Sequence, residues 1–383
     1  MEPPLEIPRD ATSKKRSRPT KSKSSKRKHR VRFADTFAGI GGFRHGLEAI
    51  GWKCAYSIEL DGKANQTYMD NFGSKHHTCG DITKEPIDSL PAFTVLAGGF
   101  PCQPFSTAGL AKNGAIGKGV REEHKLGKLV YTLLEWVEAR KPKVCLFENV
   151  KGFLAKSNRD TVEAVRKAFD EHGYHLTFQM VNAKYWVPQN RERVFMIGIR
   201  KDVGGPLNLD MSKLPDRSTV PTIASLLEPR EEVYEANKIS PRGIAGLLRH
   251  SHERMRKGKS GFFIRIITEE EQKDPETLFP CFTKNYAKQS SSCTLLACGP
   301  KCPTKEEIYN FTDYHDYDKV VKELFGGIAP RKLNKREAAR IMGFPEHSVP
   351  NPSKVQAHCQ YGNAVVPPVI SWIGEQIADH LNF

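Results

Sequence analysis

The sequence lacks any apolar run of about 18 residues or more, the length at which a membrane-spanning helix is expected. Its N-terminus also lacks the short apolar stretch of a signal peptide. We therefore expect neither a membrane span nor a secretory leader. No internal repeat is visible, and the 38% of hydrophobic residues are enough for a sizeable core.

Cysteine shows no paired pattern. The nine cysteines are scattered, and no two of them form a CxxC pair. This argues against a disulfide framework and favours a reducing compartment. Cys293, Cys298 and Cys302 follow one another loosely, with Cys281 near, but histidine is remote. We therefore expect no zinc site and no other metal.

Acidic residues are absent from residues 11–30, which hold ten Lys and Arg. The first 32 residues carry a net charge of +9, and the rest of the chain carries +6. Residues 1–31 have no apolar period, so we expect a disordered basic tail. Its basic runs fit a nuclear-import signal, a nucleic-acid arm or an unselective solvated tail. A basic body with a basic arm favours a polyanion partner.

From residue 32 on, short apolar runs alternate with amphipathic stretches. We expect strands at 31–37, 53–59, 93–99, 143–149, 174–183 and 193–199, and helices at 41–51, 62–72, 129–139 and 161–173. This alternation predicts an α/β fold with a doubly wound, mostly parallel sheet. In such sheets, ligands bind beyond the carboxyl ends of the strands.

After residue 201 the alternation fades. Because a single core usually stops growing near ~250–300 residues, a chain of 383 residues favours a large domain with a smaller one. We expect residues 202–328 to form a loop-rich inserted domain. Residues 329–383, with helices at 334–344 and 369–381, are expected to return to the domain that begins at residue 32.

A glycine-rich turn, DTFAGIGGF (35–43), joins the first expected strand to the first helix. Its glycines let a ligand approach the backbone closely. Glu59 ends the next strand, twenty residues after Gly39, where an acid can bind ribose hydroxyls, and Asp81 follows a further possible strand end. Each feature alone also fits an ordinary turn or surface acid. Together, at neighbouring strand ends, they predict a nucleoside cofactor.

A cysteine follows a buried strand in GGFPCQPFSTAG (98–109). Cys102 lies between Pro101 and Gln103, and the prolines on either side stiffen the loop that presents it. A lone cysteine after a strand is more often an inert buried thiol. The setting of this one at a ligand-facing strand end favours a nucleophile.

Two further motifs carry charge into apolar surroundings. Glu148 ends a strand in FENVKGF, where burial would raise its pKa and make it a proton donor; the alternative is a helix-capping acid. Arg191 and Arg193 alternate into a strand in PQNRERVFMIG, so they face one side. That face suits a phosphate or a base carbonyl, and surface ion pairs are the alternative.

Taken together, these motifs closely resemble the cytosine-5 DNA methyltransferases. The strings DxFAGxGG, E, GD, GFPCQPFS, ENV, QxRER, RxLxxREAARxMGFP and GNxVVPPV stand here in that family's order, across about residues 32–383. The resemblance implies a methyltransferase fold with S-adenosylmethionine as cofactor and a target-recognition domain at 202–328. It implies methyl transfer to carbon 5 of a cytosine flipped out of double-stranded DNA. A monomer is expected.

The resemblance also implies roles for the matching catalytic residues. Cys102 matches the nucleophile that attacks carbon 6 of cytosine. Glu148 matches the group that binds ring nitrogen 3 and the exocyclic amine, and Asn149 would support its loop. Arg193 would hold the base carbonyl and the Glu148 loop, with Arg191 nearby.

Further matches concern the nucleic acid and the cofactor. Ser106 matches a phosphate-contacting serine, and Gln103 is assigned to the nucleic acid with it. Leu60 stands where some members have an aromatic residue, and Ala364 where several have serine. KLGKLV replaces a glycine pair common in the loop before residue 128. The positions that match the S-adenosylmethionine pocket are Asp35, Phe37, Gly39, Ile40, Gly42, Glu59, Asp81, Pro101, Leu129 and Asn363.

Two rival functions stay open. CFTKNY at 281–286 resembles the branch of the family that methylates transfer RNA, whereas FPCQPFS favours the DNA branch. A catalytically silent DNA-binding regulator is the other rival, although Cys102, Glu148 and Arg193 are all present. The basic tail favours a nuclear location, and a bacterial chain would be cytoplasmic.

Overall fold

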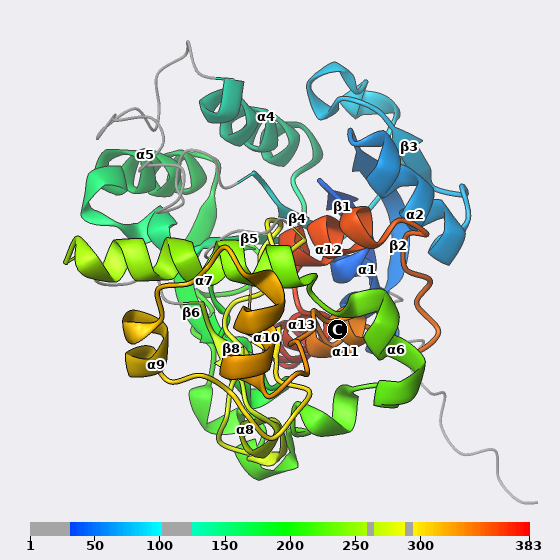
Figure 1. Cartoon of the computed structure of the whole chain (residues 1–383). Coiled ribbons are helices and arrows are strands. Elements are labelled where there is room, and N and C mark those ends of the chain that lie inside the picture. Colours follow the sequence, from blue (N-terminus) through cyan, green and yellow to red (C-terminus); the bar gives the residue numbers. More distant parts are fainter. Residues whose placement is uncertain (1–30, 102–124, 259–263, 288–293) are drawn as a thin grey trace, which may run out of the picture.

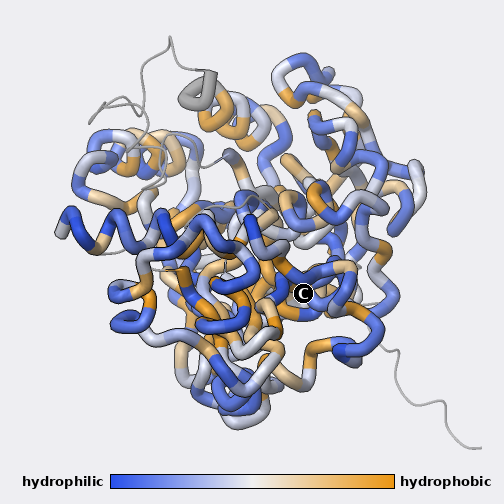
Figure 2. Tube along the Cα trace, viewed as in Figure 1, coloured by the Kyte–Doolittle hydropathy of each residue, from blue (hydrophilic) through white to orange (hydrophobic). Residues whose placement is uncertain are grey.

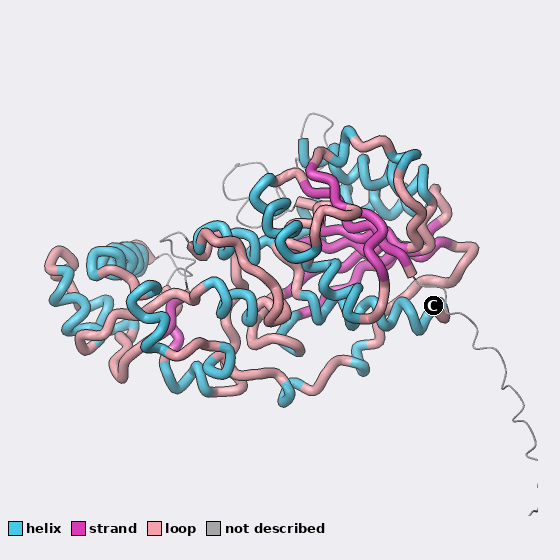
Figure 3. Tube along the Cα trace, turned by 90° about the vertical axis from the view of Figure 1, so that its right-hand side faces the viewer, coloured by secondary structure: helices cyan, strands magenta, loops and turns pink. Residues whose placement is uncertain are grey.

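The computed structural model describes residues 31–101, 125–258, 264–287 and 294–383. They form a larger body that holds the strands of the sheet and, beside it, a smaller body of helices and loops (Figure 3). The basic tail lies outside the described residues, as do three predicted site residues: Cys102, Gln103 and Ser106.

The larger body is built on a seven-stranded sheet in the order β3-β2-β1-β4-β5-β7-β6 (Figure 1). Its strands are β1 (Arg32–Thr36), β2 (Lys53–Glu59), β3 (His77–Cys79), β4 (Val95–Gly99), β5 (Val144–Val150), β6 (Tyr174–Asn182) and β7 (Glu192–Arg200). β1 to β5 run parallel, and β7 is antiparallel to both of its neighbours. The predicted α/β fold with a mostly parallel sheet is confirmed. Its order reverses at β1 and β4, where a ligand crevice is expected.

The central strands are buried on both faces, which is why they read as continuous apolar runs. In β4, Val95, Leu96 and Ala97 are fully buried, and in β5 the run from Val144 to Phe147 is buried as well. Strand β3 is short and half-exposed, so it contains no run of apolar residues from which a strand could be predicted. The sequence therefore indicated only its possible end.

Helices cover both faces of the sheet. They are α1 (Gly42–Ala49), α2 (Gly62–Phe72), α4 (Lys125–Arg140), α5 (Arg159–Glu171), α12 (Lys354–Asn363) and α13 (Pro367–Leu381). A Cβ at Gly46 would lie 2.6 Å from the Ile370 Cβ, so α1 and α13 pack in close contact. The C-terminal helix thus returns to the larger body. The helix expected at 129–139 begins earlier, at Lys125, so that all of KLGKLV belongs to α4.

The smaller body is more helical than the sequence suggested. It contains α6 (Arg230–Asn237), α7 (Pro241–Arg256), α8 (Glu269–Lys273), α9 (Lys305–Asn310), α10 (Tyr317–Phe325) and a parallel pair, β8 (Ile266–Ile267) with β9 (Leu295–Leu296). The expectation of a loop-rich segment is wrong for α7. The Ser240 hydroxyl caps this helix, Pro241 begins it, and buried Ile244, Leu247 and Leu248 recur at helical spacing. Figure 2 shows hydrophilic residues along its outer side.

The chain does not leave the larger body at residue 202. Thr177 on β6 donates a hydrogen bond to the Leu207 carbonyl at 2.7 Å, and Trp372 on α13 donates one to the Lys213 carbonyl at 2.9 Å. The segment that includes Leu207 and Lys213 therefore packs on the larger body.

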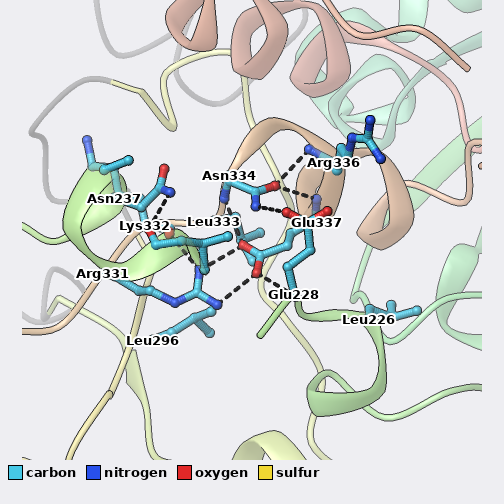
Figure 4. A network of polar contacts seen from close by, with 12 residues as sticks. Leu226, Glu228, Asn237, Leu296, Arg331, Lys332, Leu333, Asn334, Arg336 and Glu337 are labelled. Carbon is cyan, nitrogen blue, oxygen red and sulfur yellow. Dashed lines mark hydrogen bonds and ion pairs between the residues drawn. The ribbon is translucent and has the colours of Figure 1, made fainter. Parts of the chain in front are cut away.

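A buried polar network joins the two bodies where the chain returns to the larger one (Figure 4). Arg331 pairs with Glu337 through two contacts of 2.7 and 2.8 Å, and both side chains are buried. Glu337 also accepts a hydrogen bond from the Glu228 backbone N–H at 3.0 Å. Asn334 caps α11 (Lys335–Ile341). The network thus connects the chain's exit near Glu228 with its return at Arg331.

Candidate active site

The turn after β1 adopts a backbone conformation that glycine takes easily and other residues rarely do. Gly39 has a φ of +56° and Gly41 a φ of +85°. Phe37 has a φ of +53°, which is uncommon for a residue with a side chain and marks strain held by its surroundings. The turn exposes backbone amides at the end of β1, and the Gly39 N–H donates a hydrogen bond to Glu59 Oε2 at 2.8 Å.

Glu59 organises the ends of three neighbouring strands. Its Oε1 accepts hydrogen bonds from the backbone N–H groups of Leu60 at 2.9 Å and Asp61 at 2.8 Å. Its carbonyl accepts one from Gly80, directly after β3, at 2.9 Å. The carboxylate keeps lone pairs available for further donors, such as the hydroxyl groups of a ribose.

Glu148 and Arg193 form an ion pair at the carboxyl end of β5. Arg193 Nε lies 2.9 Å from Glu148 Oε1, and both side chains are largely buried. Residue 193 lies opposite Val150 in the antiparallel pairing of β5 and β7, which brings the two side chains together. Burial raises the pKa of Glu148, and Arg193 and Arg191 offset only part of that effect. This carboxyl therefore holds its proton to higher pH than an exposed glutamate does.

Arg191 joins three segments of backbone. Its Nη1 donates to the Phe282 carbonyl at 2.7 Å, and its Nη2 donates to the carbonyls of Gly362 at 3.2 Å and Ala364 at 2.7 Å. The side chain is buried, and burial and the neighbouring Arg193 lower its pKa to about 10. Arg191 thus remains a cation at neutral pH, and its hydrogen bonds hold these backbone segments together.

Cys281 belongs to this group, although no catalytic role was predicted for it. Its sulfur lies 3.6 Å from Arg191 Nη1 and 3.7 Å from Arg193 Nη2. Burial opposes ionisation of the thiol, but the two guanidinium groups outweigh burial and lower its pKa. The contact joins residues about 90 positions apart in sequence, so no local pattern could reveal it.

A cavity of about 300 Å³ lies where these groups meet. Most of the predicted residues that the structure describes line it: Phe37, Gly39, Ile40, Gly42, Glu59, Pro101, Glu148, Arg191, Arg193 and Asn363. Lining residues that were not predicted come from the start of α2 and from α12, and they include Asp61, Gln356, Cys359 and Gln360. Asp61 caps α2 and Ser353 caps α12, and both are recognisable helix-start signals, although no helix was predicted at 354–363.

Four predicted site residues do not line this cavity. Asp35 is fully buried within β1, where burial raises its pKa well above the ordinary range and Arg44 offsets part of that effect. Asp81 caps a short turn by accepting from the Thr83 N–H at 3.0 Å. Leu129 packs into the core on one face of the sheet. Asn149 is buried, and its Oδ1 accepts from the next backbone N–H at 2.8 Å.

The cavity fits a nucleoside cofactor. It combines a carboxylate at its rim, backbone amides of the turn after β1, and apolar surfaces from Phe37 and Ile40. Leu60, beside that carboxylate, is 70% exposed and offers an apolar surface next to it. An open α/β sheet with such a cavity at its switch point, next to an acid–guanidinium pair, defines a group-transfer enzyme that uses a nucleoside cofactor.

Comparisons with known proteins give the family. The model of the C-5 cytosine-specific DNA methylase family matches residues 31–379. The chain is 33% identical to the Type II methyltransferase M.HhaI of Haemophilus parahaemolyticus, over 92% of this chain and 96% of that relative. It is 31% identical to M.HpaII of Haemophilus parainfluenzae, over 91% and 89%. The fold is similar to that of S. pombe Dnmt2, with a TM-score of 0.65, 20% identity and coverage of 92% and 100%. The chain therefore belongs to the C-5 cytosine-specific DNA methylases.

The protein is a DNA (cytosine-5) methyltransferase that takes its methyl group from S-adenosylmethionine. The predicted family, activity and cofactor are thereby confirmed. The two relatives named are bacterial, so the nuclear location expected from the tail gains no support. Among the described residues, no helix is long and apolar enough to cross a bilayer. The same residues hold no group of three His, Cys, Asp or Glu side chains that could bind a metal.

Proposed function

We propose that Cys102, Glu148 and Arg193 methylate a cytosine that is flipped out of duplex DNA. The Cys102 thiolate adds to carbon 6 of the base while Glu148 gives its proton to ring nitrogen 3. Carbon 5 then becomes an enamine carbon, and bound S-adenosylmethionine supplies the methyl group that it attacks. Ring nitrogen 3 returns its proton to the Glu148 carboxylate, which restores the neutral base. A base removes the proton from carbon 5, and the thiolate leaves carbon 6 as the double bond between carbons 5 and 6 re-forms. Flipping is required because a stacked base is out of reach.

The single observation that carries this proposal is the buried ion pair of Glu148 and Arg193 at the cavity rim. Arg193 Nε pairs with one carboxyl oxygen, Glu148 Oε1. The other oxygen, Oε2, lies beside Gly99, where an added Cβ would lie 3.3 Å from it. Because the pKa of Glu148 is raised, the protonated form is available for donation to a ring nitrogen. Arg193 can at the same time hold a base carbonyl.

We assign Arg191 a positioning role. Its hydrogen bonds go to backbone carbonyls of two other segments, at Phe282 and at Gly362 and Ala364. These contacts hold the two backbone segments in place next to Arg193. A fixed backbone around the site lowers the entropic cost of bringing the base and the reacting groups together.

The proposal is tested by offering a methyl-labelled donor to duplex DNA and to transfer RNA in parallel, with wild-type chain and Cys102→Ala. We expect label in duplex DNA only, and none with the variant, because the covalent route needs the sulfur. Duplex DNA in which 5-fluorocytosine replaces the target cytosine should trap a covalent complex, since fluorine cannot leave as a proton does. Label in transfer RNA alone would overturn the choice of substrate.

We also propose that the smaller body recognises the DNA target, with α7 facing the phosphate backbone. Arg242, Arg249 and Arg256 form an exposed stripe along α7 and form no ion pair with a described residue. The buried face of α7 packs on α9 and α10, which lie below it in Figure 1, and the three arginines are exposed to solvent. Lys156 and Arg159, at the start of α5 in the larger body, are also exposed.

A triple variant of α7, Arg242→Ala with Arg249→Ala and Arg256→Ala, is expected to bind duplex DNA more weakly. Each lost phosphate contact should reduce the slope of log K against log salt by roughly 0.9, because fewer counterions are released. The measurement is a salt titration of binding to duplex DNA. The matched control removes three exposed lysines of the larger body: Lys53, Lys75 and Lys84. Equal slopes in the two triple variants would contradict the assignment of α7.

A further inference from the structure

Cys281 lies next to two arginines that line the cavity, Arg191 and Arg193, and backbone contacts hold its segment on two sides. The Phe279 N–H donates to the Pro188 carbonyl at 2.7 Å, which aligns this stretch beside the segment that leads into β7. On the other side, a Cβ at Gly362 would lie only 2.2 Å from the Thr283 carbonyl carbon. The fold therefore leaves the backbone at Cys281 little room to move.

The sulfur of Cys281 completes a cluster of charged groups. It contacts Arg191 Nη1 at 3.6 Å and Arg193 Nη2 at 3.7 Å, while Arg193 Nε pairs with Glu148 at 2.9 Å. Burial opposes ionisation of the thiol, but the two guanidinium groups prevail and lower its pKa. Of the other segments that reach these four side chains, β4 contributes Gly99 and the end of α12 contributes carbonyl groups.

The net charge of this cluster depends on the sulfur. Two guanidinium cations, one carboxylate and one thiolate sum to zero, and protonation of Glu148 leaves a charge of +1. Without the thiolate, the same protonation would leave a charge of +2. Uncompensated charge is costly where water is largely excluded, so each further positive charge makes proton uptake by Glu148 harder.

We propose that Cys281 is a positioning residue for methyl transfer: as a thiolate between Arg191 and Arg193, it offsets their charge and lets Glu148 carry the proton that the reaction needs. The inference rests on the proposed role of Glu148 as proton donor. It assigns no bond-forming step to Cys281, whose sulfur acts through the two arginines.

Reactivity of the thiol gives a test that does not depend on turnover. In the full chain carrying Cys102→Ser, alkylation of each cysteine by iodoacetamide is followed against pH by peptide mass spectrometry. We expect Cys281 to react with a midpoint below the ordinary thiol value of about 8.5. Cys54, whose burial raises its pKa to about 11, is the internal reference.

Coupling between two charged groups is reciprocal, so Glu148→Gln should move the Cys281 midpoint further down. This follows because the substitution removes a negative charge from the cluster. A midpoint at or above the ordinary thiol value, or one that Glu148→Gln leaves in place, would overturn the proposal. Neither outcome bears on whether the enzyme methylates DNA.

The pH profile of kcat provides the functional test. Cys281→Ser removes the negative charge, so we expect the alkaline fall in kcat to begin at lower pH, with turnover beyond it reduced roughly tenfold per pH unit of displacement. Cys281→Asp restores a negative charge and should move the profile back. The control is Cys298→Ser, because Cys298 is buried in the smaller body, where its thiol lies 3.7 Å from the Leu296 carbonyl.

The outcomes separate this proposal from the proposed function. If the serine and aspartate variants share the wild-type profile, the role of Cys281 is excluded while methyl transfer stands. If wild-type chain and Cys298→Ser transfer no methyl group to DNA, the proposed function fails instead. Thermal melts identify any variant that does not fold, and in that case the alkylation experiment, which leaves position 281 intact, decides.

Discussion

Glu148→Gln is expected to reduce kcat by roughly 10²–10⁴-fold, the usual contribution of a positioned proton donor. Glutamine keeps the shape of the side chain and can still accept a hydrogen bond from Arg193 Nε, which lies 2.9 Å from the carboxyl oxygen. It cannot transfer a proton to ring nitrogen 3. The measurement is single-turnover methyl transfer to duplex DNA, which reports chemistry separately from product release.

The same substitution has a pH-dependent effect on stability. Burial raises the pKa of Glu148 in the folded chain. Its stabilising contribution is therefore complete below the unfolded value, near about 4.3, and is lost as pH rises through the raised folded value. Glutamine does not titrate, so relative to wild type Glu148→Gln should gain stability across that window. Urea unfolding at pH 4 and pH 7 measures the difference.

Glu192→Gln is the matched control for both measurements. Glu192 is adjacent to Arg193 in β7, but its carboxylate pairs with Lys151 at 2.9 Å, and both side chains are well exposed. An exposed ion pair contributes about 0–1 kcal/mol, so turnover and stability should stay near wild type. Comparable turnover in Glu148→Gln and Glu192→Gln would contradict the proton-donor role.

The sequence predicted those parts of the site that lie at the ends of strands. Glu59 and Glu148 each end a strand of apolar residues, so their position and surroundings could be inferred from local pattern. The fold class followed for the same reason, because central strands buried on both faces carry continuous apolar runs. What local pattern cannot give is the order of strands, and β7 inserts between β5 and β6 against the order of the chain.

Contacts across the chain were the other part that could not be predicted. Arg191 was assigned from its spacing to Arg193, whereas its partners are backbone carbonyls near residues 282 and 362. Cys281 lies in CFTKNY (281–286), which was noted only for its resemblance to the branch of the family that methylates transfer RNA. Its contacts with the two arginines join residues about 90 positions apart, which no local pattern predicts. Asp35 matched a cofactor motif but is buried in β1. The position of a residue in a motif does not show whether its side chain lines the cavity or is buried within the sheet.

The largest expected effect on stability concerns the buried pair of Arg331 and Glu337. Glu337→Ala leaves a buried guanidinium group without its carboxylate and removes the acceptor of the Glu228 and Asn334 N–H groups, which lie at 3.0 and 2.8 Å. Breaking a buried pair by removing one partner costs about 3–5 kcal/mol. We expect both the urea midpoint and the thermal midpoint of unfolding to fall in proportion to this loss of stability. Asp379→Ala, which breaks the exposed pair with Lys213, is the control.

A double variant, Arg331→Met with Glu337→Leu, separates stability from orientation. Apolar residues of similar volume often replace a buried ion pair without loss, so most of the stability should return. The hydrogen bond to Glu228 does not return, and with it goes one contact between the exit and the return of the smaller body. We therefore expect the double variant to fold stably yet bind duplex DNA more weakly than wild type. Full affinity in a stable double variant would mean that the pair contributes stability alone, and that packing elsewhere orients the smaller body.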